Sequence, residues 1–262
     1  MNPGVKENFE NVRKNLETIK NIVLVMSGKG GVGKTSVSVN AVIGLAKRGY
    51  KVGLLDTDLH GPNVLAMLGA EGELTADTDK RVNPLIGADG VKVISLAANV
   101  PKGDAVIWRG PIKIGVILQF LKDVNWGDLD YLLIDSPPGT GDEPLTVMQF
   151  AKDKMKGCII VSTPQKVALL DTERSVSFAK KMGIPILGLV ENMSYMLCPH
   201  CGKEIEMFAR DEAYWQELKA KTIARIPFVP EASAGADKGK NIWDIGNKAL
   251  IDEYNKILDA LQ

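Results

Sequence analysis

The sequence predicts an α/β fold in which a doubly wound, mainly parallel sheet carries helices on both faces. Six short apolar runs are typical of buried strands, and segments with helical spacing lie between most of them. Parallel strands need long crossovers, which are usually helices, so this alternation favours a parallel sheet. A length of 262 residues allows one large domain, and no segment has the composition of a linker. We therefore expect one domain over residues 1–262.

The first expected element is a short helix at about residues 8–20. Phe9, Val12, Leu16 and Ile19 would form one apolar stripe along it. Residues 69–90 are expected to form a loop or a short hairpin at a sheet edge, and residues 193–208 a loop that carries a cysteine pair. The strands are expected at 22–26, 52–55, 91–94, 131–134, 158–161 and 186–190, and the further helices at about 34–48, 111–122, 143–152, 167–182 and 247–261.

Composition excludes several classes of protein. The 32 basic and 32 acidic side chains balance, so we expect neither a nucleic acid nor a membrane as partner. Three cysteines are too few for a disulfide scaffold. No apolar stretch approaches the ~20 residues that span a bilayer, and the N-terminal segment lacks an apolar signal region. These features predict a protein of the reducing cytoplasm.

A phosphate site is predicted from Gly28 to Thr35, which fits the P-loop pattern G-x-x-x-x-G-K-[ST] between a strand and a helix. Glycines let backbone N–H groups surround phosphate oxygens, and the helix N-terminus adds partial positive charge. Lys34 is expected to reach the β and γ phosphates of ATP, and Thr35 to ligate Mg²⁺. The residues expected to bind the nucleotide here are Gly30, Gly31, Val32, Gly33, Lys34, Thr35 and Ser36.

Lys29 adds a second lysine, so that this loop resembles the deviant Walker A loop of the MinD, ParA and nitrogenase iron protein group. That resemblance implies a homodimer that sandwiches nucleotide. Lys29 of each chain would then reach the phosphates bound by the other chain, where it would neutralise charge that develops in the transition state.

Carboxylates follow two of the expected strands, where ligands bind in open α/β sheets. Asp135 follows an apolar run, as in a Walker B motif, and is expected to hold Mg²⁺ through water. Asp58 is the candidate for positioning the attacking water, with Asp56 as its support. His60 is a weaker candidate for a general base, because in-line attack on phosphate needs positioning more than deprotonation.

Cys198 and Cys201 form a C-x-x-C pair, which fits half a zinc site, a redox motif or half an iron–sulfur site. Cys158 lies in an expected core strand, and His200 is expected to be a solvated loop residue. One chain therefore supplies two good thiolates where a four-coordinate site needs four. A two-fold dimer would bring four thiolates to one axis.

Taken together, these motifs resemble the Mrp/ApbC family of iron–sulfur cluster carrier ATPases over about residues 20–235. The resemblance implies a homodimer that holds a labile [4Fe–4S] cluster between paired C-x-x-C motifs and passes it to apo iron–sulfur proteins. It also implies that Asn192, Pro227 and Phe228 contact adenine. The segments that carry it are 29–36, 56–63, 108–111, 135–142 and 191–194, with the cysteine pair.

The sequence departs from that family at His60 and Asn63, where many members carry Tyr and Ser. These positions bear on the rate and coupling of ATP hydrolysis, which we expect to be slow. Two other functions stay open at this point. A positioning ATPase of the MinD/ParA type would want a basic amphipathic C-terminal helix, which residues 247–262 do not provide. An ATPase with a structural zinc at the dimer interface would use the same cysteine pair.

Overall fold

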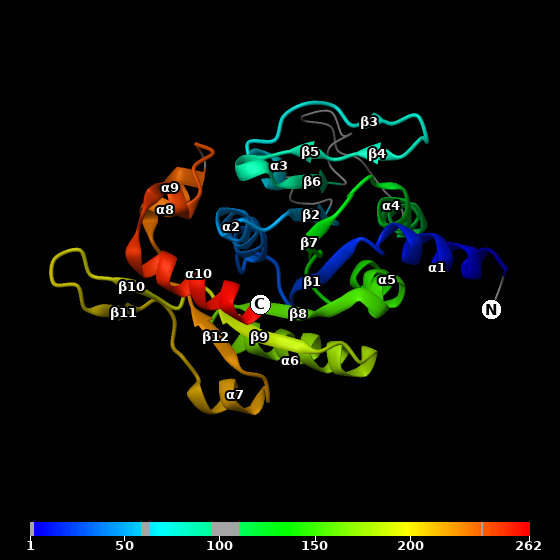
Figure 1. The fold of residues 1–262 in the computed structure, drawn as a ribbon. Helices are drawn as coiled ribbons and strands as arrows, with labels where there is room; N and C mark the ends of the chain where they lie inside the picture. The colour runs from blue at the N-terminus through cyan, green and yellow to red at the C-terminus, as the bar shows by residue number, and fades with distance from the viewer. Residues whose placement is uncertain (1–2, 59–62, 96–109, 237) are drawn as a thin grey trace.

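The computed structural model describes residues 3–58, 63–95, 110–236 and 238–262. Within these residues, a central sheet has eight strands in the order β12-β9-β8-β1-β7-β2-β6-β5 (Figure 1). Neighbouring strands are parallel except for the edge strand β5, which is antiparallel to β6. The strands are β1 (Ile19–Ser27), β2 (Val52–Asp56), β5 (Leu85–Ile86), β6 (Lys92–Ser95), β7 (Leu129–Asp135), β8 (Met155–Ser162), β9 (Ile186–Glu191) and β12 (Thr222–Arg225).

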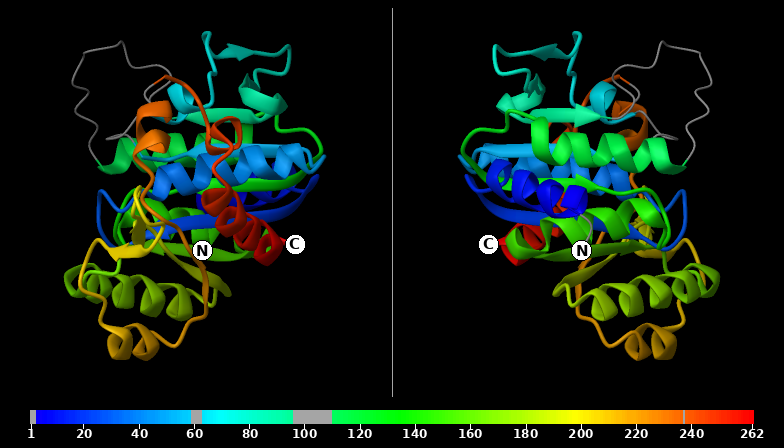
Figure 2. Two further views of the ribbon diagram at one scale, coloured as in Figure 1. Left: turned by 90° about the vertical axis from the view of Figure 1, so that its left-hand side faces the viewer. Right: turned by 90° about the vertical axis from the view of Figure 1, so that its right-hand side faces the viewer.

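Helices cover both faces of this sheet (Figure 2), which confirms the predicted fold class. Alternate residues of β1 divide between two cores, as the period of a strand requires. Leu24 and Met26 pack with α1, α4, α5 and α6, whereas Val23 and Val25 pack with α2 and α10. These helices are α1 (Pro3–Asn15), α2 (Lys34–Lys47), α4 (Gly110–Asp123), α5 (Asp142–Ala151), α6 (Lys166–Met182) and α10 (Lys248–Leu261).

The N-terminal helix differs from the prediction of residues 8–20, because α1 starts at Pro3 and ends at Asn15. Ile19 does not belong to the apolar stripe of a helix. It is the first residue of β1 and pairs with Leu129 of β7. Ile19 is therefore buried as part of the sheet, and its helical spacing from Leu16 in the sequence is a coincidence.

Residues 69–90 contain the expected short hairpin at the sheet edge. Strands β3 (Thr75–Ala76) and β4 (Val82–Asn83) pair antiparallel, and β5 follows and joins the main sheet. Two short 3-10 helices, at Ala88–Gly90 and Lys152–Lys154, precede β6 and β8.

The second half of the chain holds more regular structure than the sequence predicts. Residues 193–208 form a hairpin of β10 (Tyr195–Leu197) and β11 (Glu204–Glu206), and not an irregular loop. Further elements without a clear periodic signal in this half are β12 and the short helices α7 (Glu212–Glu217), α8 (Pro230–Ala236) and α9 (Ile242–Ile245), and the short helix α3 (Asn63–Met67) in the first half is another. Among the described residues, no helix has the length and apolar character to span a bilayer.

Candidate functional site

The candidate site lies at the carboxyl edge of the sheet, where the parallel topology gathers the ends of four strands. The glycine-rich loop follows β1, while β2 ends at Asp56, β7 at Asp135 and β9 at Glu191. Asp56 and Asp135 are direct neighbours in the register of β2 and β7. Residues that are far apart in the sequence therefore meet at one place, as is usual for ligand sites in open α/β sheets.

The glycine-rich loop is held closely against its neighbours. A Cβ atom at Gly28 would lie 2.3 Å from the carbonyl carbon of Asp171 in α6. Gly33 has a φ of 83°, and a Cβ atom there would lie 2.2 Å from Nδ2 of Asn192. That amide donates a hydrogen bond to the carbonyl oxygen of Val32 at 2.8 Å. Because the glycines carry no side chains, the loop is lined by backbone groups at the N-terminus of α2. Such a lining suits the binding of a phosphate.

Lys34 is the buried cation of this site. Its Nζ atom lies 2.8 Å from Oδ2 of Asp135, but among the described residues it has no hydrogen-bond partner of good geometry. A buried ammonium with protons left to donate fits a phosphate oxygen.

Asp135 is fully buried and accepts hydrogen bonds from two hydroxyl groups of α2. Thr35 Oγ1 donates to Oδ2 at 2.8 Å, and Ser38 Oγ donates to Oδ1 at 2.6 Å. A carboxylate and a hydroxyl in contact are hard oxygen donors of the kind that Mg²⁺ prefers. Thr35 and Asp135 therefore fit a magnesium site beside the phosphate loop, and Ser38 is a partner of Asp135 that the sequence did not single out.

Asp56 is also fully buried, and its side chain holds the following loop. Its Oδ1 accepts the backbone N–H of Asp58 at 3.0 Å, and its Oδ2 accepts the hydroxyl of Ser95 at 2.8 Å. Burial, together with the negative charge of Asp135, raises the pKa of Asp56 to about 7. Asp56 therefore holds the backbone of Asp58 in place.

Lys29 and His60 are the two remaining residues with a predicted catalytic role. Lys29 is exposed, and within the described part of the chain it makes no ion pair. His60 lies outside the described residues, as does the segment 108–109 of the predicted motif.

A cavity of about 450 Å³ adjoins the phosphate loop through Gly33 and Ser36. Asn192, Pro227 and Phe228, the residues expected at adenine, all line it. Further residues that were not predicted as ligands of the nucleotide line the cavity from the long helices α2 and α10 and from short helices and loops. They include Asn40, Asn63, Met193, Ala232, Asn241 and Tyr254.

The two candidate metal-binding cysteines lie in the turn of the β10–β11 hairpin, which projects from the body of the sheet (Figure 1). Cys198 donates its backbone N–H to Lys203 and accepts that of Gly202, so the turn is hydrogen-bonded. Backbone N–H groups of His200 and Cys201 lower the pKa of the Cys198 thiol. Such a turn favours the thiolate that binds metals.

The other cysteine and the neighbouring histidine do not extend this pair into a complete site. Cys158 is buried in β8, and burial raises the pKa of its thiol to about 12. His200 is exposed. No group of three or more His, Cys, Asp or Glu side chains suited to a metal occurs among the residues that the structure describes.

Comparison with known proteins finds close similarity over most of the chain. The family described as "ParA: NUBPL iron-transfer P-loop NTPase" matches residues 18–262. An iron-sulfur cluster carrier protein of Methanocaldococcus jannaschii is 45% identical over 95% of this chain and 87% of its own length. A protein of the same name from Deinococcus radiodurans is 45% identical over 86% of this chain and 63% of its own length.

Solved structures show the same relationship. A nucleotide-binding protein from Archaeoglobus fulgidus, in complex with ADP and with cobalt found by PIXE, is 35% identical with a TM-score of 0.79. The match covers 94% of this chain and 96% of that protein. The cell division ATPase MinD of Pyrococcus furiosus is 25% identical with a TM-score of 0.65, over 92% and 98% of the two chains.

Lys34 should be essential for nucleotide binding. Lys34→Ala removes the buried ammonium and leaves the carboxylate of Asp135 without its cation. We expect a loss of about 3 kcal/mol or more of transition-state stabilisation, with weaker ATP binding. Titration calorimetry and a phosphate-release assay would measure both. Lys47→Ala, which removes a surface lysine paired with Asp89, is the matched control. Wild-type ATP affinity in Lys34→Ala would contradict the assignment.

Asp56 should make the nucleotide-free protein less stable as the pH rises. Its pKa is about 7 when folded against an ordinary 3.8, so the folded state keeps a proton that the unfolded state has lost. The free energy of unfolding should therefore fall between about pH 4 and pH 7 by up to ~1.4 kcal/mol per pH unit.

Asp56→Asn removes this titration. Urea unfolding without Mg²⁺ at about pH 5 and about pH 8 should show the variant gaining stability relative to wild type at the higher pH. Asp89→Asn, on the surface, should show no such trend. A pH-independent difference between wild type and Asp56→Asn would refute the role of that carboxyl.

Proposed function

The chain belongs to the family of ParA-type P-loop NTPases described as NUBPL iron-transfer P-loop NTPase, and on this basis we propose that it is an ATP-dependent iron–sulfur cluster carrier. Relatives that are 42–45% identical over most of the chain are named iron-sulfur cluster carrier protein. The observation that carries the proposal is the exposed C-x-x-C turn on a hairpin that starts beside the nucleotide cavity. A resident structural metal would not need ligands so open to solvent.

The cargo is proposed to be a [4Fe–4S] cluster shared between two copies of the chain. Such a cluster takes four thiolates, and one chain offers Cys198 and Cys201 in an accessible position. A second copy related by a two-fold axis supplies the other two. Leu197, Ile205 and Met207 on the same hairpin are 41%, 43% and 37% exposed, and they would be covered in such a dimer.

ATP is proposed to bind with its phosphates in the loop that ends at Lys34 and its base in the cavity beside Asn192. Thr35 and Asp135 would hold Mg²⁺, which would neutralise charge on the phosphates. Asp58, fixed by the carboxylate of Asp56, would position the attacking water. Lys29, which has no partner among the described residues of its own chain, would act on the phosphates of the other chain. Hydrolysis is then slow until two chains meet.

The cysteine pair should be needed for cluster binding but not for nucleotide binding. Cys198→Ala with Cys201→Ala removes both thiolates from a turn that is separate from the phosphate loop. After anaerobic incubation with iron and sulfide, the double variant should hold no cluster by absorption and metal analysis, while its ATP affinity stays at the wild-type value. Cys158→Val, at a buried position, is the control and should keep the cluster.

A double variant that keeps its cluster would overturn the proposed ligands. Stoichiometric zinc in place of iron in protein purified without oxygen would favour the structural zinc site instead.

Lys29 should complement a defect in the other chain. When Lys29→Ala chains are mixed with Asp58→Ala chains, half of the dimers are mixed, and one of the two sites in each keeps both groups if Lys29 acts across the dimer. The mixture should therefore recover about a quarter of the wild-type hydrolysis rate, although each variant alone is inactive. Recovery should depend on subunit exchange, followed with labelled chains. If exchange occurs without any recovery, Lys29 acts within its own chain.

A further inference from the structure

The nucleotide cavity and the cysteine turn are joined by a very short stretch of chain. Cys198 follows Asn192 by six positions, and β10 occupies three of them. Asn192 and Met193 line the cavity, and the amide of Asn192 also bonds the phosphate loop at Val32. Only β10 and Ser194 separate these cavity residues from Cys198, so a movement of Asn192 and Met193 would be passed on to the cysteine.

The turn is held in one conformation. In this turn, at residues 192–194, the backbone of Met193 has a φ of 52°, in the left-handed region that residues other than glycine rarely adopt. Backbone hydrogen bonds fix both of its neighbours, from Asn192 N to Ser162 O at 2.8 Å and from Ser194 N to Ile226 O at 2.9 Å. Such strain persists only where surrounding contacts determine it, and it is frequent at ligand clamps.

A buried carboxylate ties the two ends of the hairpin together. Glu191, the last residue of β9, is fully buried. It accepts the hydroxyl of Ser194 at 2.5 Å, where the chain enters the hairpin, and the Nε of Arg210 at 3.1 Å, where the chain has left it. One carboxylate thus bonds both sides of the hairpin base.

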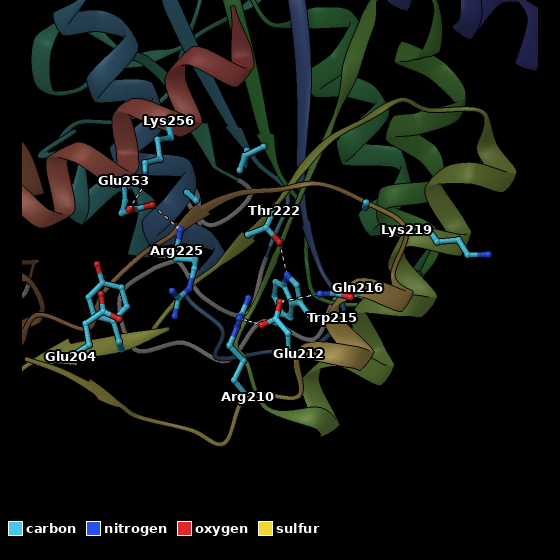
Figure 3. Close-up of a pocket in the computed structure, with 14 residues that line it drawn as sticks. Glu204, Arg210, Glu212, Trp215, Gln216, Lys219, Thr222, Arg225, Glu253 and Lys256 are labelled. Carbon is cyan, nitrogen blue, oxygen red and sulfur yellow. Dashed lines mark hydrogen bonds and ion pairs between the residues drawn. The ribbon is translucent and has the colours of Figure 1, made fainter.

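Neighbouring groups complete this cluster. Arg225 of β12 lies 3.7 Å from Glu191 and donates to the hydroxyl of Ser194 at 3.2 Å, with its guanidinium over the ring of Tyr195. Arg210 also pairs with Glu212. Figure 3 shows the two arginines reaching from different segments toward one region of a groove of about 650 Å³.

The energetics make this arrangement a rigid link. A buried carboxylate is costly unless it is paired and hydrogen-bonded. If the base of the hairpin shifted from Arg210, Oε2 of Glu191 would lose its hydrogen bond at 3.1 Å, and the longer contact of 3.7 Å with Arg225 would be the ion pair left to that carboxylate among the described residues. The hairpin and the turn at residues 192–194 therefore move together.

We propose that Glu191 and Arg210 form a clamp that transmits nucleotide occupancy to the position of Cys198 and Cys201. Nucleotide in the cavity repositions Asn192 and Met193, and the clamp turns this change into a movement of the whole hairpin. Glu191 and Arg210 are positioning residues, because neither of them lines the nucleotide cavity and the proposed cluster ligands are Cys198 and Cys201. The role of this coupling in cluster transfer rests on the proposed cluster binding at these cysteines. The coupling between nucleotide occupancy and the position of the hairpin does not rest on it.

Thiol reactivity in the cluster-free protein tests the coupling. The rate at which a chromogenic disulfide reagent modifies Cys198 and Cys201 would be measured with and without Mg·ADP, and Cys158 is too buried to contribute. In wild type the rate should change about fivefold or more when nucleotide binds. In Arg210→Gln the rate should be the same in both states, with ADP affinity unchanged, whereas Arg210→Lys should restore part of the response.

Arg81→Gln, which removes an arginine paired with Asp77 on the distant β3–β4 hairpin, is the matched control and should behave as wild type. Ser194→Ala removes one hydrogen bond of the clamp and no charged group, and should weaken the response even if Arg210→Gln folds poorly.

A full nucleotide response in both Arg210→Gln and Ser194→Ala would overturn the proposal. So would a wild-type protein whose thiols do not sense ADP, or an Arg210→Gln protein that has lost ADP affinity. Because no cluster is present, failure of the carrier function leaves this result unaffected.

Discussion

The buried carboxylate of Asp135 is the contact on which the nucleotide site depends. It meets the ammonium of Lys34 and the hydroxyls of Thr35 and Ser38, all from the first turns of α2. Its backbone oxygen also accepts the N–H and the hydroxyl of Thr57, after β2. A buried charge needs such partners, so Asp135 fixes the phosphate loop and the acidic loop after β2 relative to one another. Burial, and after it the negative charge of Asp135, raises the pKa of Asp56.

The parallel sheet extends this arrangement to the cysteines. Because β1, β7 and β9 end at one edge, the phosphate loop, Asp135 and Asn192 come together without any insertion in the fold. The β10–β11 hairpin then follows the end of β9 and carries Cys198, which is half-buried, and Cys201, which is exposed. The residues 192–194 at the cavity and the turn that carries the two cysteines are therefore separated by β10 alone, and Glu191, the last residue of β9, directly precedes them.

The fold and the phosphate loop were predictable because their signals are local. Lys34 and Thr35 belong to one contiguous motif, and the apolar runs before Asp56 and Asp135 indicate strand ends. The hairpin strands have three residues each, and the side chains of β11 are all exposed, so they show no alternation. Ile19 matched a helical spacing although pairing with Leu129 places it in β1. The partners of Glu191 come from three segments, a contact that no local pattern records.

Native mass spectrometry of the chain after anaerobic reconstitution with iron and sulfide tests the central claim most directly. Two chains with two accessible thiols each should carry one four-iron cluster between them, which gives about one cluster per two chains. Mild chelation should release the cluster and leave the bound nucleotide in place. A cluster on each single chain, or a dimer that holds zinc and takes up no iron, would contradict the account.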